Sequence, residues 1–147
     1  MAVYLDSSAL VKLVVTEPES EALGQFLRRR PERVTSALAR VEVLRAVRAH
    51  GEPAIKRAVR VLARVRLLRV DDGVLDSAAG LDPRVLRSLD AIHIASAREL
   101  GGDLESLVTY DRRMSEATVI LGMPVRAPGT AGDRDRPRSR RSRRPSP

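Results

Sequence analysis

Four acidic residues, far apart along the chain, are the side chains best suited to carry out a chemical reaction. Asp6 ends the apolar run VYLD at residues 3–6, and Asp111 ends the run LVTYD at residues 107–111. Both runs predict short strands, so each acid is expected at the carboxyl end of a strand. Ligands of open α/β sheets bind outside those ends, where the strand order reverses, so the two carboxylates can converge there.

Glu42 is the third acid, and it lies in a predicted helix at the edge of an apolar stripe. The stripe is expected to contain Leu38, Val41 and Leu44. The alternative to a functional role is a surface ion pair with Arg45, three residues further on, which would contribute about 0.2–0.5 kcal/mol. Taken alone, Glu42 leaves both interpretations open.

Asp90 is the fourth acid, and its helix face is unusual for a charged residue. Within SLDAIHIASA, residues 88–97, three- and four-residue spacing places it on one face with His93, Ile94 and Ala97. An acid among apolar side chains suits a functional site, but the helix dipole also favours an acid in the first turn. A single histidine on such a face is more typical of a structural hydrogen bond, so His93 is left out of the catalytic set.

If the four acids meet, their mutual repulsion requires a counter-charge. Carboxylates within a few ångströms raise one another's pKa. A hard cation with oxygen ligands relieves this repulsion, and Mg²⁺ or Mn²⁺ is the natural candidate. Two divalent ions would balance four negative charges, whereas one would leave a net charge of about −2. The chemistry that such a cluster supports is phosphodiester hydrolysis by a metal-activated water.

The elements that must position these acids alternate along the chain. Apolar runs predict strands, and capping signals with helical spacing predict helices between them. The alternation favours an α/β fold, with a central parallel sheet and helices on both faces. The expected strands are 3–6, 33–36, 66–70, 107–111 and 123–127, and the expected helices are 16–30, 37–50, 52–65, 72–81, 88–100 and 115–121.

The positive charge is concentrated at the end of the chain. The 147 residues carry a formal net charge of +8, and the last 19 residues hold seven arginines against two aspartates. We therefore predict a folded domain over residues 1–128 and a disordered Arg/Pro/Ser-rich tail over residues 129–147. The tail is interpreted as a solubilising extension, with a non-specific RNA tether as the alternative.

Composition excludes several other classes of site. The chain has no cysteine and only two histidines, which argues against disulfides, thiolate metal sites and a multi-histidine zinc centre. No apolar stretch is long enough to span a membrane, and the N-terminus lacks the basic leader of a signal peptide. The expected location is the cytoplasm.

Four segments together resemble a known family, the PIN-domain nucleases, and specifically the VapC-type toxins. The segments are VYLDSSALVKL (3–13), ARVEVLRA (39–46), SLDAIHIASARELG (88–101) and LVTYDRRM (107–114), and the similarity covers residues 2–127. The resemblance implies a three-layer α/β/α fold and a Mg²⁺-dependent endoribonuclease that is toxic without its VapB-type antitoxin. It also implies a homodimer, and an antitoxin segment that covers the site.

The resemblance assigns roles residue by residue. Asp6, Glu42 and Asp90 match the metal-site acids of the family, and Asp111 matches the fourth, more variable acid. Ser7 and Thr109 match small polar positions near the site, with supporting roles.

Three other classes of protein also use acidic residues of this kind. A haloacid-dehalogenase-like phosphatase needs a second acid two positions after the first, but Asp6 is followed by Ser7 and Ser8. A phosphate-accepting receiver domain needs an acidic pair beside the first strand, where this sequence has one acid. No phosphate loop of the GxxxxGK[ST] type occurs in the sequence. A non-catalytic basic RNA-binding or regulatory module, in which the acids are structural, stays open as the alternative.

Overall fold

A five-stranded sheet forms the middle of the molecule, and all its neighbouring strands are parallel. The computed structural model describes residues 1–84 and 86–133. The strand order is β3-β2-β1-β4-β5, so the predicted parallel sheet is confirmed. The strands are β1 (Ala2–Leu5), β2 (Arg33–Ser36), β3 (Arg66–Leu68), β4 (Leu104–Val108) and β5 (Val125–Arg126).

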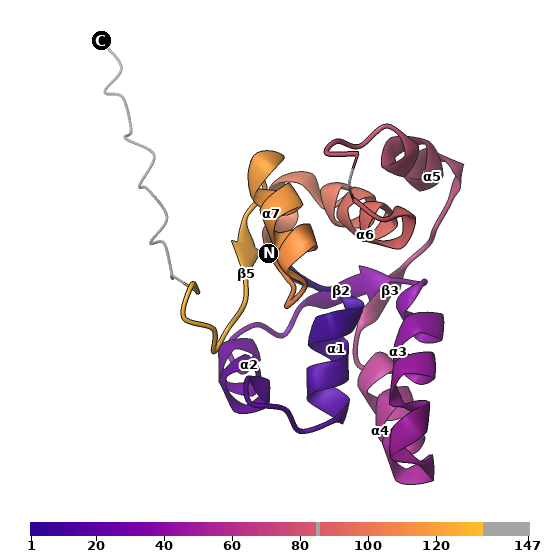
Figure 1. The fold of residues 1–147 in the computed structure, drawn as a ribbon, viewed down its shortest axis with the longest axis vertical. Helices are drawn as coiled ribbons and strands as arrows, with labels where there is room; N and C mark the ends of the chain where they lie inside the picture. The colour runs from indigo at the N-terminus through magenta and orange to yellow at the C-terminus, as the bar shows by residue number, and fades with distance from the viewer. Residues whose placement is uncertain (85, 134–147) are drawn as a thin grey trace.

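Helices cover both faces of this sheet, which gives three layers (Figure 1). One face carries α1 (Ser7–Val14), α2 (Ser20–Leu27), α3 (Ala39–Val47) and α4 (Glu52–Leu62). The other side of the molecule carries α5 (Asp72–Ala79), α6 (Ser88–Arg98) and α7 (Arg112–Ile120). Two short 3₁₀ turns, η1 (Arg48–His50) and η2 (Gly101–Asp103), follow α3 and precede β4.

The central strand β1 divides the core into two parts. Successive side chains of a strand point to opposite faces. Val3 and Leu5 pack with the α1–α4 layer, whereas Ala2 and Tyr4 pack with α6 and α7. All four residues are buried, because helices cover both faces of a parallel sheet.

The strand order reverses between β1 and β4, beside the first acid. The chain moves outward from β1 through β2 to β3, then crosses back to place β4 on the other side of β1. Asp6 follows β1 directly, and its main-chain N–H donates to the carbonyl of Val108 at the end of β4. Asp6 therefore lies at the switch point, where α/β sheets bind their ligands.

The first helix begins earlier than the sequence predicts. Thr16 was expected to cap a helix over 16–30, but the structure has α1 from Ser7 and a separate α2 from Ser20. Asp6 is the cap of α1, with extended backbone and a side chain that accepts a hydrogen bond from the N–H of Ala9. The acid at the strand end thus also starts a helix.

Asp111 does not lie at the end of a strand, which corrects the prediction for residues 107–111. The strand β4 ends at Val108, and Asp111 is the N-cap of α7. Its carboxylate accepts a hydrogen bond from the N–H of Met114. An aspartate at this position caps the helix, because its carboxylate accepts a hydrogen bond from an N–H of the first turn that would otherwise be unpaired. The chain therefore starts α7 at Asp111 and does not continue the strand to it.

The apolar stripe predicted for α3 is wrong at Val41, whereas Leu44 is partly buried against the core as predicted. The buried residues of this helix are Ala39, Val43 and Val47, whereas Val41 is 57% exposed. The helix turns the face that contains Ala39, Val43 and Val47 toward the core.

The C-terminal segment is described as far as Asp133. The Asp133 carboxylate forms an ion pair with Arg126, at 2.8 Å between Oδ1 and Nε. The remainder of the predicted tail, residues 134–147, lies outside the described residues, so its disorder stays a prediction. Within the part of the chain that the structure describes, no helix has the length and apolar character needed to cross a bilayer.

Candidate active site

Asp6 is the buried acid of the candidate site. Its Oδ1 accepts hydrogen bonds from the Ser8 hydroxyl (2.6 Å) and the Ala9 N–H (2.9 Å). Its Oδ2 accepts a 2.5 Å hydrogen bond from the Thr109 hydroxyl. Burial raises the pKa of Asp6 above its ordinary value, and the hydrogen bonds from Ser8 and Thr109 oppose that shift. The carboxylate is thereby held in one orientation at the switch point.

Thr109 and Ser8 join the two strand ends on either side of this acid. Thr109 lies directly after β4, and its Oγ1 also accepts a hydrogen bond from the Asp111 N–H. The Ser8 hydroxyl donates to Asp6 and accepts from the N–H of Tyr110. Thr109 was predicted to lie near the site in a supporting role, whereas Ser8 was not predicted there. Its only sequence signal is a hydroxyl residue two positions after the strand-end acid.

Glu42 is oriented by residues from two other elements. Its Oε1 accepts from the Ser7 hydroxyl at 2.7 Å and lies 2.6 Å from Nε2 of His93. Burial alone would raise the pKa of Glu42, but hydrogen bonds from His93 and Ser7 outweigh burial and lower it. In the structure Glu42 therefore points to His93 and Ser7, and not to Arg45.

His93 links this acid to the middle of the sheet. The imidazole is 1% exposed, and its Nδ1 lies 2.7 Å from the Tyr4 hydroxyl, which accepts the N–H of Ser36. With both ring nitrogens engaged, His93 connects α6 to β1 and α3. This is a structural hydrogen-bonding position beside the acids.

The pKa of Asp90 is raised, and the other three acids contribute to that shift. Burial raises its pKa first, and the negative charges of Asp111, Asp6 and Glu42 raise it further, while His93 opposes the shift. Its carboxylate accepts no hydrogen bond from residues 1–84 or 86–133. Asp90 is half-buried, and among the described residues it is the one of the four acids whose carboxylate accepts no hydrogen bond.

The donor set suits a hard divalent cation. All four candidate ligands are carboxylates, which Mg²⁺ and Mn²⁺ prefer as ligands. A bound cation would also relieve the electrostatic repulsion between these carboxylates. As the side chains lie, no three acids or histidines among the described residues form a ready-made ligand group. Asp6 and Glu42 instead direct their oxygens at the hydroxyl and imidazole groups named above.

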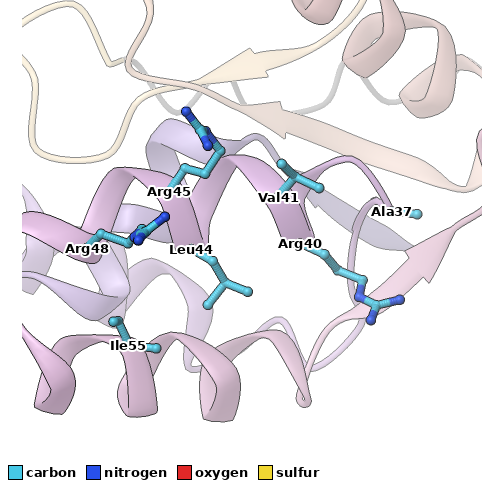
Figure 2. A pocket seen from close by; sticks show the side chains of 7 residues that line it. All are labelled: Ala37, Arg40, Val41, Leu44, Arg45, Arg48 and Ile55. Atoms are coloured by element: carbon cyan, nitrogen blue, oxygen red, sulfur yellow. The ribbon is translucent and has the colours of Figure 1, made fainter.

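A separate apolar groove lies between α3 and α4 (Figure 2). It has a volume of about 640 Å³, and its lining is Ala37, Arg40, Val41, Leu44, Arg45, Arg48 and Ile55. In Figure 2, Leu44 points from α3 toward α4, where Ile55 lies. None of the four acids lines the groove. Val41, which does line it, directly precedes Glu42 in the sequence.

Comparison with known proteins places this geometry in a family. The PIN domain model matches residues 3–120. Ribonuclease VapC46 of Mycobacterium tuberculosis is 60% identical over 127 residues, which is 86% of this chain and 98% of the relative.

Two solved structures have the same fold. The crystal structure of Mycobacterium tuberculosis VapC20, a toxin that cleaves the sarcin–ricin loop, has a TM-score of 0.65 at 21% identity, over 78% of this chain and 94% of that chain. VapBC2 from Rickettsia felis, bound to a DNA fragment from its promoter, has a TM-score of 0.64 at 12% identity, over 86% of this chain and 98% of that chain. The family model and the 60% identity to VapC46 show that the chain belongs to the PIN-domain family, as a VapC-type ribonuclease toxin.

Proposed function

We propose that this VapC-type toxin hydrolyses phosphodiester bonds of RNA, with Mg²⁺ or Mn²⁺ held by Asp6, Glu42, Asp90 and Asp111. The observation that carries the proposal is the Asp6 carboxylate, which Ser8 and Thr109 hold at the switch point of the sheet. The pKa of Asp90, which burial raises first and the charges of Asp111, Asp6 and Glu42 raise further, agrees with it. The description of VapC46 as a ribonuclease supports RNA as the substrate.

The residues around the acids have a positioning role in this proposal. Bound divalent cations would supply an activated water and would neutralise negative charge on the phosphate. Ser8 and Thr109 hold the Asp6 carboxylate in a fixed orientation, and His93 and Ser7 hold Glu42. No nucleophilic side chain is needed, so the enzyme forms no covalent bond to RNA.

The test is RNA cleavage by the purified full-length protein with Mg²⁺ and with EDTA. Cleavage should be lost with EDTA and in Asp90→Asn, while Asp76→Asn should cleave at the wild-type rate. Asp76 is a matched control because it is an exposed aspartate on α5. Cleavage that persists in EDTA, or that Asp90→Asn leaves intact, would refute the metal-dependent mechanism. RNA binding without cleavage by the wild type would favour the non-catalytic module.

We also propose that the groove between α3 and α4 receives a segment of a VapB-type antitoxin. Leu44, Val41 and Ile55 give the groove an apolar lining, and the three arginines among its lining residues give it positive charge. A partner segment with apolar side chains and carboxylates matches that chemistry. The toxin–antitoxin complexes among proteins of this fold support a protein partner of this kind.

Two further expectations belong to the same proposal. We expect a homodimer, which sedimentation or light scattering would test. We also expect the protein to act in the cytoplasm, where RNA substrates are found.

A further inference from the structure

Arginines gather where α2 ends and the chain leaves β5. A cavity of about 550 Å³ lies there, and its lining includes Phe26, Arg28, Arg29, Arg30, Arg126 and Asp133. The C-terminal segment runs beside α2 in Figure 1. Gly129 fixes this packing, because a Cβ at that position would lie 2.9 Å from Cβ of Ala22, and its φ of +90° favours glycine.

Two arginines in this region have structural partners. Arg30 donates through Nε to Glu105 at 2.6 Å, and through Nη1 to the carbonyl of Phe26. Arg33 donates to the carbonyls of Arg30 and Leu27. These groups satisfy carbonyls at the end of α2, where the helix dipole favours positive charge. The positions of Arg30 and Arg33 therefore need no ligand to explain them.

Arg126 pairs with Asp133, another residue of the cavity lining. Its Nε and Nη2 donate to the two carboxylate oxygens of Asp133 at 2.8 and 3.0 Å, and the Ala127 N–H donates to Oδ1 at 3.0 Å. The Phe26 ring lies 3.9 Å from Cζ of Arg30 and 4.8 Å from Cζ of Arg126. This contact holds both guanidinium groups in place.

Arg28 and Arg29 differ from these neighbours. Both are exposed, and neither side chain forms a hydrogen bond or ion pair with another residue that the structure describes. They leave positive charge uncompensated at the rim of the cavity. After Asp133 the sequence continues with seven arginines and one aspartate over residues 134–147, so this rim is where the most basic part of the chain begins.

The cavity reaches from the carboxyl end of β5, where Arg126 lies, toward the amino end of β4, where Arg30 pairs with Glu105. Arg28 and Arg29, which precede β2, lie toward that amino end, and Arg126 lies on the side of the candidate active site. Arg126 ends β5 and pairs with Val108 of β4, and the Thr109 N–H donates to the Arg126 carbonyl. Asp6 follows β1, the strand on the other side of β4. The strands β1 and β5 are therefore two strand spacings, or about 10 Å, apart. Tyr110 connects the two places, since its N–H donates to Ser8 and its hydroxyl donates to the Pro128 carbonyl.

We propose that Arg28 and Arg29 form a docking site for the phosphate backbone of single-stranded RNA whose scissile bond lies at the four acids. This inference rests on the proposed function for the choice of RNA as the ligand. Exposed guanidinium groups bind phosphate oxygens through paired N–H donors. Contacts of this kind add affinity without sequence preference and hold a substrate in register.

The test compares two double variants of the full-length chain. Arg28→Gln with Arg29→Gln removes the docking charges, while Arg60→Gln with Arg64→Gln removes two exposed arginines on and after α4. Binding of a labelled single-stranded RNA is measured by fluorescence anisotropy in EDTA between 50 and 200 mM salt. We expect the first variant to bind about threefold to tenfold more weakly, with a salt slope reduced by about 1.4, and the second to match the wild type.

Other outcomes are equally informative. Equal losses in both double variants, or no loss in the first, would overturn the docking site. A loss seen with duplex DNA and not with RNA would overturn the assignment to RNA. In cleavage assays the first variant should raise KM and leave kcat unchanged. If the wild type does not cleave RNA but the selective binding loss persists, the proposed function fails and the docking site stands.

Discussion

The hydroxyl of Thr109 donates a 2.5 Å hydrogen bond to Oδ2 of Asp6, although the two residues are 103 positions apart in the sequence. Thr109 follows β4 and Asp6 follows β1, so this bond joins the two strands between which the strand order reverses. Because both residues are buried, the hydrogen bond holds the Asp6 carboxylate away from bulk water.

Thr109→Val should destabilise the protein by about 1–3 kcal/mol at neutral pH, because Asp6 Oδ2 loses its donor. Loss of this hydrogen bond should also raise the pKa of Asp6 further. Urea unfolding measures the stability change.

The matched control for this prediction is Thr118→Val. Thr118 is equally buried, but its hydroxyl donates to the neutral carbonyl of Met114. We expect a smaller loss there, of about 1 kcal/mol. Equal losses of stability in the two variants would mean that the negative charge of Asp6 does not strengthen the contribution of the Thr109 hydrogen bond to stability.

Asp90→Asn should stabilise the metal-free protein, because Asp90 is repelled by Asp111, Asp6 and Glu42. The half-buried position is screened by solvent, so we expect only about 0.5 kcal/mol. In the wild type, Mg²⁺ at ten times its Kd should add about 1.4 kcal/mol of stability by binding the folded state alone.

Thermal unfolding with EDTA and with Mg²⁺ checks both parts of this prediction. The Mg²⁺ increment should shrink in Asp90→Asn and stay at the wild-type value in Asp76→Asn. An equal increment in all three proteins would show that Asp90 does not belong to the cation site.

Asp133→Asn should lower the free energy of unfolding by about 1–2 kcal/mol, because it removes the charge that Arg126 holds through two hydrogen bonds. Burial would raise the pKa of Asp133, but the Arg126 hydrogen bonds outweigh burial and lower it. A lowered pKa in the folded state means that this stabilisation is present above the unfolded-state pKa of about 3.9, and is lost as pH falls through the folded-state value.

Urea unfolding at several pH values tests the sign. The difference between wild type and Asp133→Asn should be constant from pH 5 to 7 and should decrease toward pH 3. A difference that grows on acidification would contradict the ion pair as its source.

Val41→Glu should weaken antitoxin binding and leave RNA binding unchanged, because it introduces a negative charge into the groove between α3 and α4. The matched control is Val59→Glu on α4. Val59 is 54% exposed against 57% for Val41, and it does not line the groove. Titration calorimetry with a cognate VapB-type antitoxin measures the change. Equal weakening by the two variants would exclude the groove as the docking surface.

Local patterns were sufficient to predict much of the fold. The run Arg33–Ser36 is a strand as predicted, and Asp6 follows a buried strand because VYL is apolar and β-prone. The first helix and its cap were missed. Asp6 can end a strand and cap a helix at the same time, and strand periodicity reports only the first of these roles.

The sequence alone determined which residues carry charge, where the apolar runs lie, and that strands and helices alternate into a parallel sheet. Those properties are local, since they depend on neighbours within a turn or a strand. Tertiary structure decided the long-range partners of Glu42 and Asp6. Glu42 meets His93 from 51 positions away, and Asp6 meets Thr109 across the switch point, although both acids have charged or hydroxyl residues closer in sequence. Such contacts depend on how strands are ordered and helices packed, so no spacing along the chain specifies them.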